Sequence, residues 1–208
     1  MKISFRVLTV LTIALLTTAS CRKTESNQAT PRNTKAFMKV ASGIGYPGSP
    51  VGASFCGVGV TRTLFAGQNI NAGTVMVNKD FNTGIVYVTY TAAGNWYFNS
   101  LHLYIGEQSS CAIPVNSAGA PVPGQFPYQA DLSTSPLQSY TFAITGLTGN
   151  CFCIAAHADM AEIVNGQTIQ MQTGWGDGTQ IMPGGNWSTK FDVCITDCSD
   201  GGGTNGLR

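Results

Sequence analysis

Few side chains in this chain could carry out chemistry. Among its 208 residues there are two histidines, His102 and His157, and each lies in an alternating stretch typical of a β-strand. We interpret both as partly buried imidazoles that are hydrogen-bonded to neighbours, with a ligand-binding role as the alternative. No G-x-S-x-G motif occurs, and no pair of carboxylates is marked as lying across a cleft. The sequence therefore indicates no catalytic residue, and an enzyme of unknown class is the least favoured function.

The other reactive groups are cysteines, of which the chain has 7. An even number follows the N-terminal segment, and in an exported protein this predicts three disulfides. The cysteines concerned are Cys56, Cys111, Cys151, Cys153, Cys194 and Cys198. The sequence does not choose their pairing. Cys151 and Cys153 lie two apart in an extended stretch, so they share a face and are expected to have different partners.

A metal site is the sharper alternative for part of this stretch. Cys151, Cys153, His157 and Asp159 would share one face of a strand. The alternative is disfavoured because exported thiols tend to be oxidised and because the spacing matches no zinc motif. We therefore predict no metal and no cofactor.

The most individual stretch of the chain is rich in glycine and tryptophan. Trp175 and Trp187 stand in glycine-rich turns, where their flat faces could stack on a sugar ring with Asp177 and Asn186 at the rim. The favoured alternative is structural, with Trp175 capping the end of the sandwich and Trp187 beginning the last strand in the core. The candidate ligand-binding residues are Trp175, Asp177, Asn186, Trp187, His102 and His157.

The N-terminal segment predicts export. Two cations, Lys2 and Arg6, precede the apolar run 7–16, and small residues follow, as in a secretory leader over residues 1–20. The apolar run is too short to cross a bilayer. Ala19-Ser20-Cys21 resembles a bacterial lipobox, which implies acylation of Cys21, as by palmitate, and anchoring at the cell envelope, most simply at the outer membrane. The alternative is an ordinary cysteine after a soluble-secretion leader, because Thr18 replaces the usual Leu.

Charge is unevenly distributed. Residues 21–39 hold five cations and one acid, which predicts a flexible basic tether, either in contact with anionic lipid headgroups or simply solvated. Residues 40–207 hold three cations and nine acids, a net charge of minus six. This acidic body argues against a nucleic-acid partner.

The composition and periodicity predict a packed all-β domain. The chain is 43% hydrophobic and 10% charged, which excludes a disordered polyelectrolyte and a coiled coil. Alternating β-branched and aromatic runs predict strands at 73–78, 85–91, 97–105, 139–145, 151–159, 167–173 and 188–196, with a weaker pattern at 58–64. We expect an antiparallel β-sandwich over residues 40–199, with a barrel less favoured, and a flexible glycine-rich tail over 200–208.

Two finer predictions concern the connections. Turn residues between the strands of 73–105 predict a three-stranded meander. Prolines and glycines over 107–136 predict a long surface loop, which Cys111 would hold in place.

Several sequence blocks resemble a largely uncharacterised domain of secreted bacterial proteins, including surface lipoproteins of the Bacteroidetes kind. The blocks are AGQ (66–68), YVTY (87–90), HLYIG (102–106), PGQFPY (123–128), AAHA (155–158) and GWG with NW (174–176 and 186–187). The resemblance implies an extracellular β-rich module without an assigned activity. Both histidines fall inside these blocks, which raises the chance that they meet.

We therefore expect a lipid-anchored binding module of the cell envelope, with carbohydrate or a surface polymer as its ligand. A structural or adhesive protein with a protein partner is the alternative. An aromatic platform would favour the first function and an exposed apolar strand edge the second. Convergence of His102 and His157 with an acid in a pocket would favour an enzyme.

Overall fold

A computed structural model describes residues 43–48, 50, 55 and 59–196. All of them belong to one compact unit, which spans Lys35–Arg208. The predicted leader, Cys21, the tether, the C-terminal tail, Cys56 and Cys198 lie outside the described residues.

The described part is all-β and antiparallel, as predicted. Its strands are β1 (Gly43–Pro47), β2 (Val60–Ala66), β3 (Ile70–Lys79), β4 (Val86–Ala92), β5 (Trp96–Glu107), β6 (Tyr128–Asp131), β7 (Ser139–Ile144), β8 (Cys151–Val164), β9 (Gln167–Gly176), β10 (Thr179–Gln180) and β11 (Thr189–Cys194). Two short 3₁₀ turns, η1 (Gln108–Ser110) and η2 (Pro123–Gln125), interrupt the connection between β5 and β6. Each predicted strand overlaps an observed one, whereas the short β1, β6 and β10 were not predicted.

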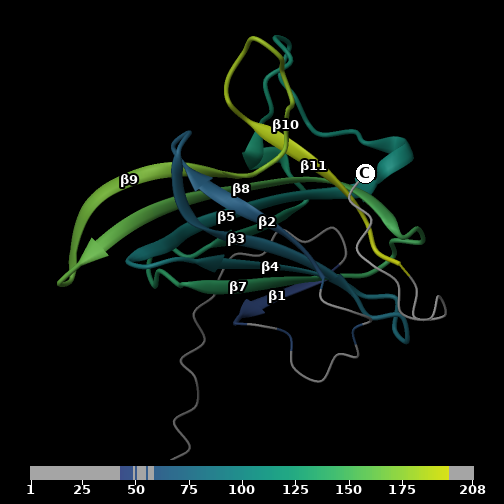
Figure 1. Cartoon of the computed structure of the whole chain (residues 1–208), viewed down its shortest axis with the longest axis horizontal. Coiled ribbons are helices and arrows are strands. Elements are labelled where there is room, and N and C mark those ends of the chain that lie inside the picture. The colour runs from purple at the N-terminus through teal and green to yellow at the C-terminus, as the bar shows by residue number, and fades with distance from the viewer. Residues whose placement is uncertain (1–42, 49, 51–54, 56–58, 197–208) are drawn as a thin grey trace, which may run out of the picture. The chain divides into compact units, whose positions relative to one another are not determined.

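The strands form one sheet that curves nearly into a barrel (Figure 1). Its order runs β1-β7-β4-β3-β2-β9-β8, and β5 pairs along the opposite edge of β8 with β6 beyond it. The N-terminal part of β8 also pairs with β11, which in turn carries β10. Four neighbouring strands, β6, β5, β8 and β9, therefore lie side by side.

The inner face of the sheet holds the main hydrophobic core. Alternate residues of β4 and β5 point into it, and Tyr90 and Phe98 have no exposed surface. Their rings meet edge-on with centroids 6.0 Å apart, and Phe142 of β7 meets Tyr90 at the same distance. Such aromatic pairs stabilise the core beyond the area they bury.

The predicted meander is wrong at its third strand. β3 and β4 pair as expected, but β5 pairs with β8 and β6 and forms no ladder with β4. The reason is that residues 137 and 138 lie between them: Ala92 donates its N–H to Gln138, and Phe98 exchanges hydrogen bonds with Leu137. The chain therefore turns a corner after β4 instead of forming a hairpin.

The predicted loop over 107–136 is shorter than expected. Residues 128–131 form β6, which pairs with β5 along Ser100–Leu103, so the irregular excursion is reduced to about residues 111–127. As predicted, Cys111 ties this excursion down, through a disulfide to Cys153 on β8. A second disulfide joins Cys151 to Cys194 on β11. The two neighbouring cysteines of β8 therefore do have different partners.

The outer face of the sheet is covered at one end. Tyr104, Phe126, Cys153, Ala155 and Trp175 form a second buried cluster there. Partly buried residues from the excursion and from the β10–β11 connection pack against it: Cys111, Ile113, Ile181 and Trp187. The other end of the same face is open to solvent and carries the polar residues described below. Among the described residues, the structure has no helix with the length and apolar character to cross a membrane.

Candidate functional site

A β-bulge in β5 decides which side chains reach the outer face. The apolar core positions of this strand change from even to odd numbers, from Trp96 and Phe98 to Leu101 and Leu103. The pairing with β8 shifts between Phe98 and Ser100, where one extra residue is accommodated. Ser100 consequently lies on the same outer face as His102. The phase change is visible in the sequence and could have predicted the bulge.

Strand register places outer-face residues in two rows across β6, β5, β8 and β9. The first row runs Gln129, His102, His157, Trp175, since each residue is the cross-strand partner of the next. The second row runs Asp131, Ser100, Asp159, Thr173. Directly opposite residues have neighbouring side chains, so these rows form one continuous surface.

The two histidines meet in the first row. The Nδ1 atoms of His102 and His157 are 3.2 Å apart, a distance at which one ring donates its N–H to the other. The ring of His157 also packs edge-on against Trp175, with centroids 4.8 Å apart. His157 is buried and His102 is partly exposed. The expectation that each imidazole bonds to a neighbour is confirmed, and the neighbour is the other histidine.

Burial keeps both imidazoles neutral near pH 7. It lowers the pKa of His157 to about 4; the carboxylate of Asp159 opposes this shift and His102 adds to it. Burial also lowers the pKa of His102, again opposed by Asp159. A neutral imidazole has a free lone pair, which is the form that accepts a hydrogen bond or binds a metal ion.

Asp159 connects the histidines to the second row. One of its carboxylate oxygens lies 3.9 Å from Nε2 of His157. The other accepts a 2.5 Å hydrogen bond from the hydroxyl of Ser100. At the end of the row, the hydroxyl and N–H of Ser133 donate to Asp131 and lower the pKa of that carboxyl. Hydroxyl groups therefore orient two carboxylates that remain accessible to solvent.

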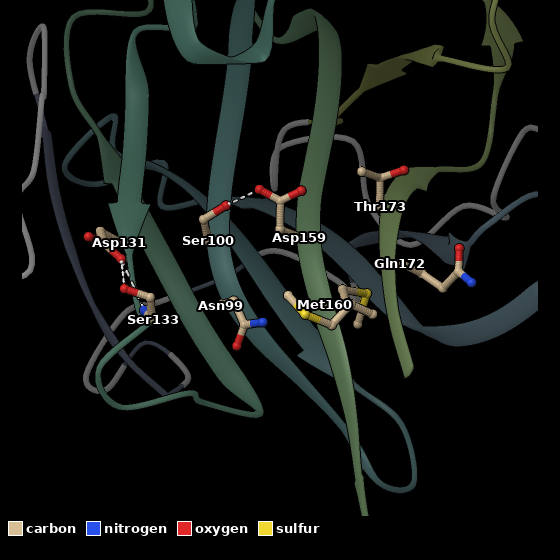
Figure 2. A pocket seen from close by; sticks show the side chains of 9 residues that line it. Asn99, Ser100, Asp131, Ser133, Asp159, Met160, Gln172 and Thr173 are labelled. Atoms are coloured by element: carbon tan, nitrogen blue, oxygen red, sulfur yellow. Dashed lines mark hydrogen bonds between the residues drawn. The ribbon is translucent and has the colours of Figure 1, made fainter. Parts of the chain in front are cut away.

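An open groove of about 450 Å³ follows the second row. It is lined by Asn99, Ser100, Asp131, Ser133, Asp159, Met160, Met171, Gln172 and Thr173. Figure 2 shows Asp131, Ser100, Asp159 and Thr173 one after another, in this order, on the neighbouring strands β6, β5, β8 and β9. Both histidines lie in the neighbouring row and are not among the residues that line the groove, so they converge with Asp159 beside the groove and not inside it. Of these polar groups, only Asp159 was expected from the sequence to share a face with a histidine.

The structure separates the six predicted ligand-binding residues. His102, His157 and Trp175 meet in the first row, and Trp187 packs against the second cluster. Trp175 is 6% exposed, so it offers no flat face to a sugar ring, and the structural alternative describes it better. Asp177 and Asn186 are exposed beside β10 and are not among the groove residues, and Asn186 accepts hydrogen bonds from Ser188.

The cysteine-containing metal set considered from the sequence is wrong. Cys151 and Cys153 are both in disulfides and are not available as ligands. The shared face was correct, since His157 and Asp159 do lie together on the outer face of β8. Their third neighbour is His102, which lies 55 residues away in the sequence.

No protein family model, curated protein or solved structure matches this chain. The resemblance to secreted surface domains therefore stays a prediction.

Proposed function

We propose that the chain is a lipid-anchored binding module of the cell envelope that holds a carbohydrate or a surface polymer in the outer-face groove. The lining of that groove supports the proposal. Hydroxyl and carboxylate groups of the second row lie side by side across four adjacent strands, and sugar hydroxyls can both donate to and accept from such groups. The volume of about 450 Å³ is within the range of small-molecule sites.

The charge of the body narrows the class of ligand. Residues 40–207 carry a net charge of minus six, and the groove itself contains Asp131 and Asp159. Like charges repel, so a polyanionic polymer is disfavoured and a neutral or cationic glycan is expected. Because the groove is open to solvent, a chain longer than its contact site can extend past it.

A glycan array followed by calorimetry on the identified glycan tests this function. Asp131→Ala removes an exposed charged acceptor from the groove, and we expect affinity to fall about ten- to hundredfold, as for loss of a charged hydrogen bond. Asp192→Ala is the matched control, because its carboxylate is also exposed but lies on β11 outside the groove. Absence of glycan binding by the wild type, or equal losses in both variants, would contradict the proposal.

A protein partner is the second candidate function, and one observation favours it. Ile169 and Met171 on β9 are 59% and 65% exposed. On its side away from β8, β9 pairs with β2 along Gly174–Gly176 only. In the described part of the chain, no strand pairs with that edge of β9 in the residues that come before Gly174. An open apolar edge can accept a strand from another chain.

The substitution Ile169→Lys separates the two functions, because Ile169 lies outside the groove. If the partner is a protein bound at the β9 edge, this variant should lose adhesion of whole cells while Asp131→Ala retains it. If the ligand is a glycan, the opposite result is expected. Both variants should be compared at equal amounts on the cell surface.

A further inference from the structure

The strongest cluster of metal-ligating groups in the described residues is His102, His157 and Asp159. Each offers one ligand atom, and these atoms all lie within 4.8 Å of one another. They come from two adjacent strands, β5 and β8, whose hydrogen-bonded ladder fixes His102 directly opposite His157. The positions are therefore set by rigid secondary structure and not by loops, as a preorganised site requires.

The distance between the imidazoles fits a shared metal ion. Two nitrogen ligands that each lie about 2.0–2.1 Å from a tetrahedral ion are roughly 3.3 Å apart. The observed distance between the two Nδ1 atoms is 3.2 Å. An ion between them would replace the single shared hydrogen bond by two coordination bonds. Both rings are neutral near pH 7, so each has one nitrogen with a free lone pair. The ring that donates in the observed pair has to shift its proton from Nδ1 to Nε2 before both Nδ1 atoms can bind the ion.

The surroundings supply a third ligand and its support. Asp159 lies 3.9 Å from Nε2 of His157, so its carboxylate has to rotate to reach an ion held by the two Nδ1 atoms. Its side chain is 42% exposed, which leaves room for that rotation, and its negative charge partly offsets that of the cation. Ser100 donates a hydrogen bond to the second carboxylate oxygen and orients it, as residues that are hydrogen-bonded to metal ligands do. Trp175 packs against the ring of His157 and holds it in place.

We propose that His102, His157 and Asp159 bind one divalent transition-metal ion, of the class of Zn²⁺ or Cu²⁺, on the outer face of the sheet. Imidazole and carboxylate ligands suit this class, whereas Mg²⁺ and Ca²⁺ prefer sets made of oxygen alone. Three protein ligands leave a coordination position open, and the groove of the second row adjoins the site. This proposal does not depend on the carbohydrate function.

Metal titration of the purified full chain tests the site. The protein should carry no histidine tag and should be stripped with a chelator before Zn²⁺, Cu²⁺ and, as a negative control, Ca²⁺ are added. We expect one Zn²⁺ or Cu²⁺ per chain, a rise in melting temperature on binding, and no response to Ca²⁺. The electron paramagnetic resonance spectrum of the Cu²⁺ form should show coupling to two imidazole nitrogens.

Variants distinguish this site from adventitious binding. His102→Gln and Asp159→Asn change partly exposed side chains, and each should weaken affinity roughly tenfold or more while the metal-free melting temperature stays near that of the wild type. Asp192→Asn is the matched control, because its side chain is also 42% exposed and lies on the neighbouring strand β11. It should bind as the wild type does.

Two results would overturn the proposal. One is the absence of saturable Zn²⁺ or Cu²⁺ binding by the wild type, in which case the pair is only a hydrogen-bonded contact. The other is undiminished binding by His102→Gln, which would place the ion elsewhere. If His102→Gln fails to fold, the nitrogen coupling in the Cu²⁺ spectrum of the wild type decides between these outcomes.

Discussion

At the scale of single residues, the facing imidazoles of His102 and His157 are the unusual feature. Burial removes water from both rings, which makes the charged forms unfavourable, and each ring would also repel a charge on the other. The pair is therefore sensitive to acid. Asp159 reduces this sensitivity without removing it, since it raises both pKa values while burial lowers them further.

We predict that the metal-free protein loses stability between pH 6.5 and about 4. The pKa of His157 is lowered to about 4 in the folded chain, whereas an unfolded histidine titrates near 6.5. Between these two pH values the unfolded state binds protons that the folded state does not bind, so the free energy of unfolding decreases as the pH decreases. Urea midpoints at pH 7.5 and 5.0 measure the effect.

The double variant His102→Gln, His157→Gln should lose less stability than the wild type over this interval, because glutamine does not titrate. Asp192→Asn should behave as the wild type. The carboxyls of Glu107 and Asp131 contribute little to the change in stability down to pH 5.0, because hydrogen bonds lower both of their pKa values. An equal loss in the double variant would show that other groups control the acid response.

The tryptophan nearest the site also gives a prediction at this scale. Trp175 is buried against His157 and Phe126, whereas Trp187 is only partly buried at the edge of the same cluster. Trp175→Ala should cost about 3–5 kcal/mol of stability, the range for truncating a buried aromatic residue. Trp187→Ala should cost less. Chemical denaturation of both variants measures this difference, and a smaller loss for Trp175→Ala would contradict the packing.

At the scale of elements, the two disulfides constrain different parts of the fold although they close loops of similar length. Cys111–Cys153 and Cys151–Cys194 have sequence separations of 42 and 43. The first fastens an irregular excursion onto the outer face of β8. The second joins β8 to β11, which the ladder already holds together. Their effects on the unfolded chain should be nearly equal, while their local effects should differ.

We predict that the Cys111→Ser, Cys153→Ser and Cys151→Ser, Cys194→Ser double variants each lose about 2–4 kcal/mol of global stability. Only the first should become sensitive to limited proteolysis within residues 111–127, because the excursion then loses its attachment to β8. Mass spectrometry of the fragments locates the cleavage. Equal proteolysis of the two variants would indicate that packing, and not the disulfide, holds the excursion.

At the scale of the whole molecule, one sheet uses its two faces for different purposes. The inner face encloses the main core, and the outer face is divided between the apolar second cluster and the polar rows. The acidic body would attract cations to the outer face and repel polyanions. These properties suit the binding of the small or neutral ligand that we propose.

The anchor itself gives a prediction at this scale, and it rests on the sequence because Cys21 lies outside the described residues. The wild type should fractionate with membranes and carry an acylated Cys21 as its mature N-terminus, since two or more acyl chains hold a protein on a bilayer stably. Cys21→Ser should move to the soluble fraction, and Ser26→Ala should not. Mass spectrometry of the mature terminus checks the modification, and an unmodified terminus at another residue would contradict it.

Features that depend on near neighbours could be predicted from the amino-acid sequence alone. Alternation of apolar residues predicted the main strands, and the odd-numbered positions of β8 predicted that His157 and Asp159 share a face. The cysteine spacing predicted different partners for Cys151 and Cys153, and the excursion was expected to be tied at Cys111. The strands, the shared face and the separate cysteine partners follow from the two-residue period of a strand, which is a local property. The tie at Cys111 follows from the even number of cysteines.

Which distant segments meet is visible only in the folded chain. No local sequence pattern predicts that β5 pairs with β8 instead of β4, or that residues 128–131 form a strand. The same holds for the positions of Ser100 and Asp131 beside Asp159. Strand pairing is non-local, and a shift of one residue in register would turn His102 away from His157 to the opposite face. The candidate site consists of cross-strand neighbours, so it forms only when all four strands pair in the observed register.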